Sequence, residues 1–109
     1  MRIPGIGELE LACLLSVARN GDDAYGAVVR RDLSARASRD YAVGAIYTTL
    51  QRLEDKALVS SEMSEPTAVR GGRAKRCYRV TTAGSKALRR ERELASALWK
   101  GVPAHMSPA

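Results

Sequence analysis

The sequence predicts a mainly α-helical protein with one small β-hairpin, in the order three helices, two strands and a final helix. Three observations lead to this prediction. Apolar residues recur at helical spacing in three stretches before residue 57. Two short segments with β-branched and aromatic residues follow, separated by a loop that contains Pro66 and Gly71-Gly72. A last amphipathic stretch occupies residues 82–102.

The length of 109 residues suffices for one domain with an appended helix. We expect the domain to occupy residues 1–81, the helix residues 82–102, and a flexible tail residues 103–109. A chain of this size buries only about two-thirds of the surface that it exposes when unfolded, so a partner subunit would add stability.

The first predicted helix, residues 8–19, is apolar around most of its circumference. Such a helix needs cover on more than one side, and a chain this short offers little protein to cover it. Asn20-Gly21 is typical of a helix end. We therefore take this helix as the first indication of a dimer.

The second predicted helix, residues 24–37, begins after Asp22 or Asp23, either of which is a suitable N-cap. The third, residues 42–56, has an apolar stripe made of Val43, Ile46, Tyr47, Leu50 and Leu53. Its opposite face has no acid before Leu53 and is small and neutral near the N-terminus, unlike an ordinary solvated face. A helix that enters a groove is expected to look like this.

The strands are predicted at residues 58–63 and 75–81. In the second strand, Tyr78 and Val80 alternate with Cys77 and Arg79, which predicts one buried and one exposed face. Thr81 is the expected N-cap of the final helix. In that helix a nearly heptad-spaced seam, broken by Glu91, consists of Leu88, Ala95, Leu98 and Val102.

The composition argues against an enzyme. The single histidine, His105, lies in the tail, so no serine has a histidine to activate it. Neither metal-ligand spacing nor a Gly-rich phosphate loop is found, so we expect no metal and no cofactor. The longest uncharged apolar run, residues 11–18, is far shorter than the ~20 residues that span a bilayer. With no signal peptide visible, we expect no membrane partner and a cytoplasmic location. Cys13 and Cys77 are expected to be buried, reduced thiols in the core and the strand, with redox sensing as the alternative.

The net charge of +6 is concentrated in one segment. Residues 66–92 contain nine basic residues and one acid, whereas the rest of the chain has nine basic and eleven acidic residues. Three helices followed by a basic hairpin are the order of a winged helix-turn-helix, whose third helix enters the major groove of double-stranded DNA. The residues expected to contact DNA are Gly44, Ala45, Tyr47, Thr48, Thr49 and Arg52 on the helix, and Arg70, Arg73, Lys75 and Arg76 on the wing.

Several motifs resemble those of PadR-like transcriptional regulators. The motifs match the family in order and spacing over about residues 7–101. They are Gly7-Glu8-Leu9-Glu10, Asp23-Ala24-Tyr25-Gly26, residues 44–54 followed by Leu58-Val59, residues 71–76, and residues 78–84. Many members have Pro where this chain has Thr48, and Gly where it has Ala57. A single helix after the wing resembles the short class of the family.

The resemblance implies a homodimer that acts mostly as a repressor, with the first and last helices at the dimer interface. The expected interface residues are Leu9, Cys13, Leu88, Ala95, Leu98, Trp99 and Val102. In some members, aromatic residues of the last helix line a cavity between subunits that takes planar molecules. Trp99 is therefore a candidate for an effector pocket that binds a small aromatic compound, with interface packing as the alternative.

We therefore expect a dimeric repressor that reads a near-palindromic operator. Residues 42–56 should lie in the major groove, and the wing, residues 64–75, on the backbone or in the minor groove. Two other functions remain as alternatives. One is a winged-helix module for protein association, because fold alone does not determine function. Its third helix should be acidic or hydrophobic and its wing uncharged. The other is a non-specific architectural DNA binder, whose basic residues should cover all faces.

Replacing Arg73 with alanine is expected to weaken binding to all DNA sequences alike. A phosphate contact carries no sequence information, so its loss should weaken every complex equally. Binding of the variant should also release about one counterion fewer from the DNA. The slope of log K against log salt concentration should then flatten by about 1. An unchanged slope in a salt titration would refute the phosphate contact.

Overall fold

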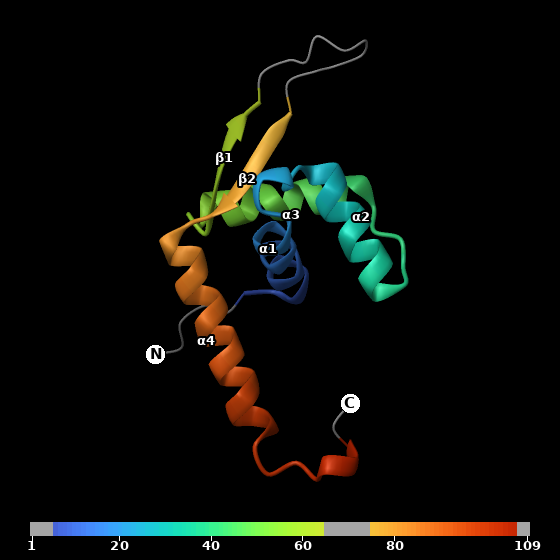
Figure 1. Cartoon of the computed structure of the whole chain (residues 1–109), viewed down its shortest axis with the longest axis vertical. Helices are drawn as coiled ribbons and strands as arrows, with labels where there is room; N and C mark the ends of the chain where they lie inside the picture. The colour runs from blue at the N-terminus through green and yellow to red at the C-terminus, as the bar shows by residue number, and fades with distance from the viewer. Residues whose placement is uncertain (1–5, 65–74, 107–109) are drawn as a thin grey trace.

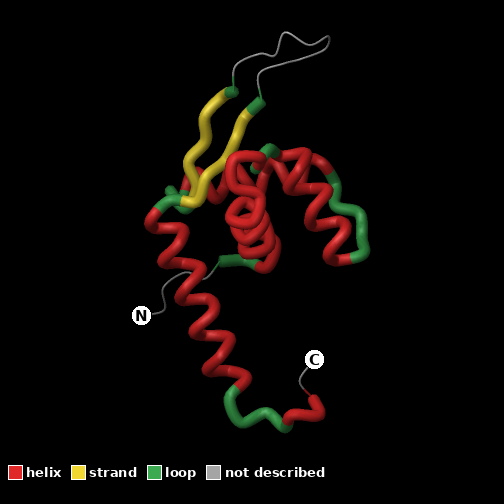
Figure 2. Tube along the Cα trace, viewed as in Figure 1, coloured by secondary structure: helices red, strands yellow, loops and turns green. Residues whose placement is uncertain are grey.

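The structure is a computed structural model and describes residues 6–64 and 75–106. Its elements are α1 (Glu8–Asn20), the 3-10 turn η1 (Gly21–Asp23), α2 (Gly26–Ala37), α3 (Val43–Asp55), β1 (Val59–Met63), β2 (Arg76–Val80), α4 (Thr82–Trp99) and the 3-10 turn η2 (Ala104–Met106). This confirms the predicted order. Figure 1 shows α1, α2 and α3 grouped into one body, from which the hairpin and α4 project in opposite directions. In Figure 2 the two strands are the only extended elements among the described residues.

The core lies where α1, α2 and α3 meet. Its fully buried side chains include Leu14, Val29, Ile46, Leu50 and Leu53. The apolar stripe predicted for α3 is therefore correct at its centre. At its edge the prediction was wrong, because Val43 and Tyr47 are about half exposed. Helical spacing locates the middle of a stripe better than its margins.

Strand β2 is the inner strand of the hairpin. It pairs antiparallel with β1, from Val59 opposite Val80 to Met63 opposite Arg76. Its other edge pairs with the chain before α2, where the Tyr78 N–H donates to the Ala24 carbonyl at 2.9 Å. Cys77 is thereby covered too, and its Sγ donates to the Asp22 carbonyl at 3.3 Å. The predicted alternation of a buried and an exposed face therefore fails at Cys77, whose thiol is buried, as expected, by a segment distant in sequence.

The start of α2 differs from the prediction. Asp22 and Asp23 lie in η1, and α2 begins at Gly26 after Tyr25, with no side-chain cap. A Cβ at Gly26 would lie 2.4 Å from the Tyr47 ring. The glycine therefore lets Tyr47 of α3 pack directly on the first turn of α2.

Ala57, between α3 and β1, has a left-handed backbone with φ of 61°. Glycine adopts this conformation freely, whereas a residue with a Cβ pays roughly 1 kcal/mol. The chain thus keeps the turn that the family resemblance implies for this position, with a strained residue in place of glycine.

Helix α4 is attached to the body only by its first turns. Thr81 caps it as predicted, since its Oγ1 accepts from the Gly84 N–H at 3.0 Å. Gly84 and Ala87 are buried, while every described residue after Glu91 is exposed. The helix ends at Trp99, so the predicted end at Val102 was three residues too late. Gly101, with φ of 86°, continues the chain in a conformation that a helix does not allow.

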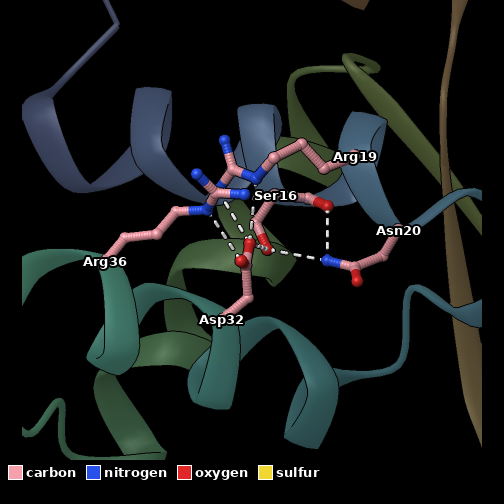
Figure 3. Close-up of polar contacts among 5 residues, drawn as sticks. All are labelled: Ser16, Arg19, Asn20, Asp32 and Arg36. Carbon is pink, nitrogen blue, oxygen red and sulfur yellow. Dashed lines mark hydrogen bonds and ion pairs between the residues drawn. The ribbon is translucent and has the colours of Figure 1, made fainter.

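A polar cluster joins α1 to α2 around Asp32 (Figure 3). Oδ2 of Asp32 accepts from Ser16 Oγ at 2.7 Å and from Arg19 Nη2 at 2.7 Å, and Oδ1 accepts from Arg36 Nε at 2.8 Å. Ser16 is fully buried, and its Oγ also accepts from Asn20. Burial by itself raises the pKa of Asp32, but these hydrogen bonds outweigh it and lower the pKa to about 2.

Replacing Asp32 with asparagine is expected to lower the free energy of unfolding at pH 7 by about 2 kcal/mol, because the folded state favours the carboxylate. A lowered folded-state pKa stabilises above the unfolded pKa, so this contribution disappears as the pH falls from about 4 to about 2. Urea unfolding at a series of pH values should show the two proteins converging in that range. A difference that stays constant down to pH 2 would contradict the assignment.

Candidate nucleic-acid interface

The outward face of α3 is uncharged over its first two turns. Its exposed residues are Gly44, Ala45, Tyr47, Thr48, Gln51 and Arg52, with Asp55 in the last turn. Nothing lies within 4 Å of a Cβ placed on Gly44, so the helix backbone is open to close approach there. Most residues predicted to contact DNA from this helix therefore share one accessible surface.

Thr49 is an exception to the predicted site. Its side chain is only 4% exposed, and its hydroxyl donates to the Ala45 carbonyl at 2.6 Å. Thr49 lies three residues after Ile46 and next to Leu50, on the flank of the buried stripe. It is a core residue and is not available for a base contact, whereas its neighbour Thr48 is exposed.

A groove of about 560 Å³ runs between α2 and α3 beside this face. Its lining residues are Ala27, Arg30, Arg31, Ser34, Ala35, Asp40, Val43 and Tyr47. Arg30 Nε donates to the Tyr41 carbonyl at 2.7 Å and so fixes the turn between the two helices. Arg31 is exposed and brings a positive charge to the groove rim.

The base of the wing is linked to the last turn of α3. Arg76 Nη1 donates to Ser61 Oγ at 2.8 Å, and Ser61 Oγ donates to Glu54 Oε2 at 2.6 Å. Lys75 Nζ stands 5.7 Å from the centre of the Tyr25 ring. The predicted wing residues Lys75 and Arg76 are exposed and lie beside the helix-turn-helix.

Arg70 and Arg73 lie outside the described residues, so their contacts stay predictions. The Glu54–Ser61–Arg76 chain was missed by sequence reasoning, since no local pattern relates residues on three different elements. Gln51 was also absent from the predicted site, although its spacing from Thr48 already placed it on the same face.

The C-terminal end of α3 is also joined to α1. Lys56 Nζ, just after the helix, lies 2.7 Å from Glu10 Oε2. Burial by itself raises the pKa of Glu10, but the hydrogen bond from Lys56 and the Gly7 N–H lower it overall. Helix α3 is thus held at its C-terminal end by an ion pair to α1 and by the hydrogen bonds to the wing.

The predicted dimer residues differ in how far they are exposed. Ala95, Leu98, Trp99 and Val102 are exposed, and Leu9 and Leu88 are partly buried against the core. Cys13 has no exposed surface, because it lies inside the core of its own chain, so its assignment to an interface was wrong. Burial raises the pKa of Cys13 to about 12, which keeps the thiol protonated.

Within the described ranges, 6–64 and 75–106, no three His, Cys, Asp or Glu residues are grouped as metal ligands. Likewise, no helix in that part of the chain is long and apolar enough to cross a membrane.

Three packed helices, the third with one exposed face, and a two-stranded wing define a winged helix-turn-helix of the transcription-regulator class. The sequence model described as the transcriptional regulator PadR-like family matches residues 14–90. The chain therefore belongs to the PadR family, whose members are non-enzymatic DNA-binding regulators.

Individual relatives agree with this assignment. The chain is 37% identical to the transcriptional regulator Rv3488 of Mycobacterium tuberculosis over 81 residues, which are 74% of this chain and 71% of that protein. A PadR family transcription regulator from Clostridium difficile superposes with a TM-score of 0.69 at 22% identity, covering 93% of this chain and all of that one. RosR from H. salinarum gives 0.68 at 22% identity over 89% of this chain and 80% of that chain. At these identities the two structures support the fold alone.

Proposed function

We propose that the chain is a homodimeric repressor that binds a near-palindromic operator, with α3 in the major groove and residues 64–75 on the backbone or in the minor groove. The observation that carries the proposal is the outward face of α3, which is exposed, uncharged over two turns and flanked by Arg52 and the wing base. Such a face can approach base edges while neighbouring cations contact phosphates.

Dimerisation is supported by the C-terminal half of α4, in which every residue from Arg92 to Trp99 is exposed. Its exposed apolar residues include Leu94, 54% exposed, Leu98, 70% exposed, and Trp99, 50% exposed. On α1, Leu15 is also exposed at 40%. A two-fold dimer through these helices would present two recognition helices to half-sites about 34 Å apart.

We also propose a cytoplasmic location and a small-molecule effector for this regulator. A regulator of genes acts where the DNA is, so we place the dimer in the cytoplasm. The half-exposed ring of Trp99 is the candidate contact for a small planar aromatic effector between the subunits.

A gel-shift assay with DNA upstream of the chain's own gene, competed by random DNA, tests the proposed function. A repressor of this kind should retain its operator at moderate salt against excess competitor. Equal displacement by random DNA would favour the architectural binder. No retention of any duplex at low salt would favour a module for protein association.

A further inference from the structure

The outward face of α3 is organised as one line of residues along the helix. Gly44, Thr48, Gln51 and Asp55 follow each other at spacings of four, three and four residues, which places them on successive turns of one face. All four are exposed. Gln51 lies opposite the buried side of the helix and is the largest neutral polar side chain on this line.

The amide of Gln51 has a defined orientation. Its Nε2 donates to Asp55 Oδ1 at 3.0 Å. A carboxylate only accepts hydrogen bonds, so the NH₂ end of the amide must be the end that faces Asp55. One N–H is used in this bond. The second N–H and the Oε1 carbonyl have no other hydrogen-bond partner among the described residues.

The free donor and acceptor of Gln51 match one base edge. In the major groove adenine presents the N7 acceptor beside the N6 amino donor, and a glutamine amide can pair with both. Guanine presents two acceptors there, and cytosine presents a donor without an adjacent acceptor. Resting on the proposed place of α3 in the major groove, we propose that Gln51 determines specificity by reading an adenine in each half-site, and that Asp55 is the positioning residue for its amide.

Asp55 has two opposite effects on DNA binding in this arrangement. Its negative charge repels nearby phosphates of any duplex, which lowers affinity without regard to sequence. The same carboxylate restricts the amide of Gln51 before DNA arrives, so less side-chain freedom is lost on binding. Charge and positioning can therefore be separated by substitution, since asparagine keeps an acceptor at Oδ1 and removes the charge.

The test is selection of binding sites from random duplexes with the full-length protein, followed by affinity measurements on single-base variants of the selected site. For the wild type, we expect one A·T pair in each half-site whose replacement by G·C costs about 5- to 100-fold in affinity. In Gln51→Ala this preference should fall to within about twofold, while the other positions keep theirs. In Gln51→Glu the preference should move to cytosine, because a carboxylate accepts from the cytosine amino group.

Variants of Asp55 test the positioning role. Asp55→Asn should bind random DNA more tightly and keep the adenine preference, whereas Asp55→Ala should bind random DNA more tightly and discriminate less. Glu93→Gln, on an exposed site of α4, serves as the control for removing one negative charge elsewhere.

The outcomes separate the inference from the proposed function. A selected site whose preferences are all unchanged in Gln51→Ala would overturn the role of Gln51 and leave the operator-binding function intact. If no sequence is enriched although the protein is folded, both fail. Equal discrimination in Asp55→Ala and Asp55→Asn would remove the role of Asp55.

Discussion

Replacing Leu98 with aspartate is expected to convert the proposed dimer to monomers and to lower affinity for the proposed operator by about 100-fold or more. Leu98 is 70% exposed in the single chain, so its substitution should cost the monomer little. In the proposed dimer, however, two charges would enter an apolar interface without partners. A monomer contacts one half-site and loses the gain that comes from linking two.

Sedimentation equilibrium and operator titration measure the two effects in the same samples. Ser96→Asp is the matched control, because it introduces the same charge two residues away at an exposed position off the apolar seam. The control should remain dimeric and bind the operator like the wild type. A dimer of unchanged strength in Leu98→Asp would show that this part of α4 is not the interface.

Replacing Gly84 with alanine is expected to destabilise the fold by about 3 kcal/mol. A Cβ at Gly84 would lie 2.1 Å from the Leu58 carbonyl oxygen and 2.8 Å from Val80 Cγ1. The first of these is a backbone atom that also accepts from the Thr81 N–H at 3.1 Å, so it cannot move without loss of the junction between hairpin and helix. The melting temperature should fall by roughly 4–8 °C for each kcal/mol.

Gly44→Ala is the control for this substitution, since both glycines are helical and only Gly44 faces open space. It should stabilise the protein by about 0.5–1 kcal/mol, because alanine restricts the unfolded chain more than glycine does. Thermal unfolding followed by circular dichroism at one protein concentration compares the three proteins. A Gly84→Ala variant as stable as the wild type would mean that α4 can shift away from the hairpin at no cost.

The bounds of the predicted helices and strands agree with the structure to within three residues, and the largest difference is at the end of α4. Helical and strand spacing reflect local backbone geometry, so a pattern of apolar residues is sufficient to find them. The stop of α4 at Trp99 was missed because Val102 continues the apolar spacing, while the backbone leaves the helical conformation at Lys100, with ψ of 128°, and turns at Gly101.

The residues of the candidate site were predicted less accurately than the helices and strands. Thr48 and Thr49 are adjacent and chemically identical, yet one is exposed and the other is 4% exposed. A step of 100° around the helix separates them, and composition gives no measure of how far the core extends around α3. Gln51 was on the predicted face but was not singled out as a contact residue, since the sequence does not show the hydrogen bond to Asp55 that orients its amide.

The sequence by itself determined the order of elements, the amphipathic third helix, the basic segment after residue 66 and, through its motifs, the PadR family. All of these depend on residues that are close in the chain. Only the tertiary structure decided that Cys13 is enclosed by its own subunit, that Asp32 joins α1 to α2, and that Glu54, Ser61 and Arg76 connect α3 to the wing. Burial and hydrogen bonding at these positions come from segments far apart in sequence, which no local pattern records.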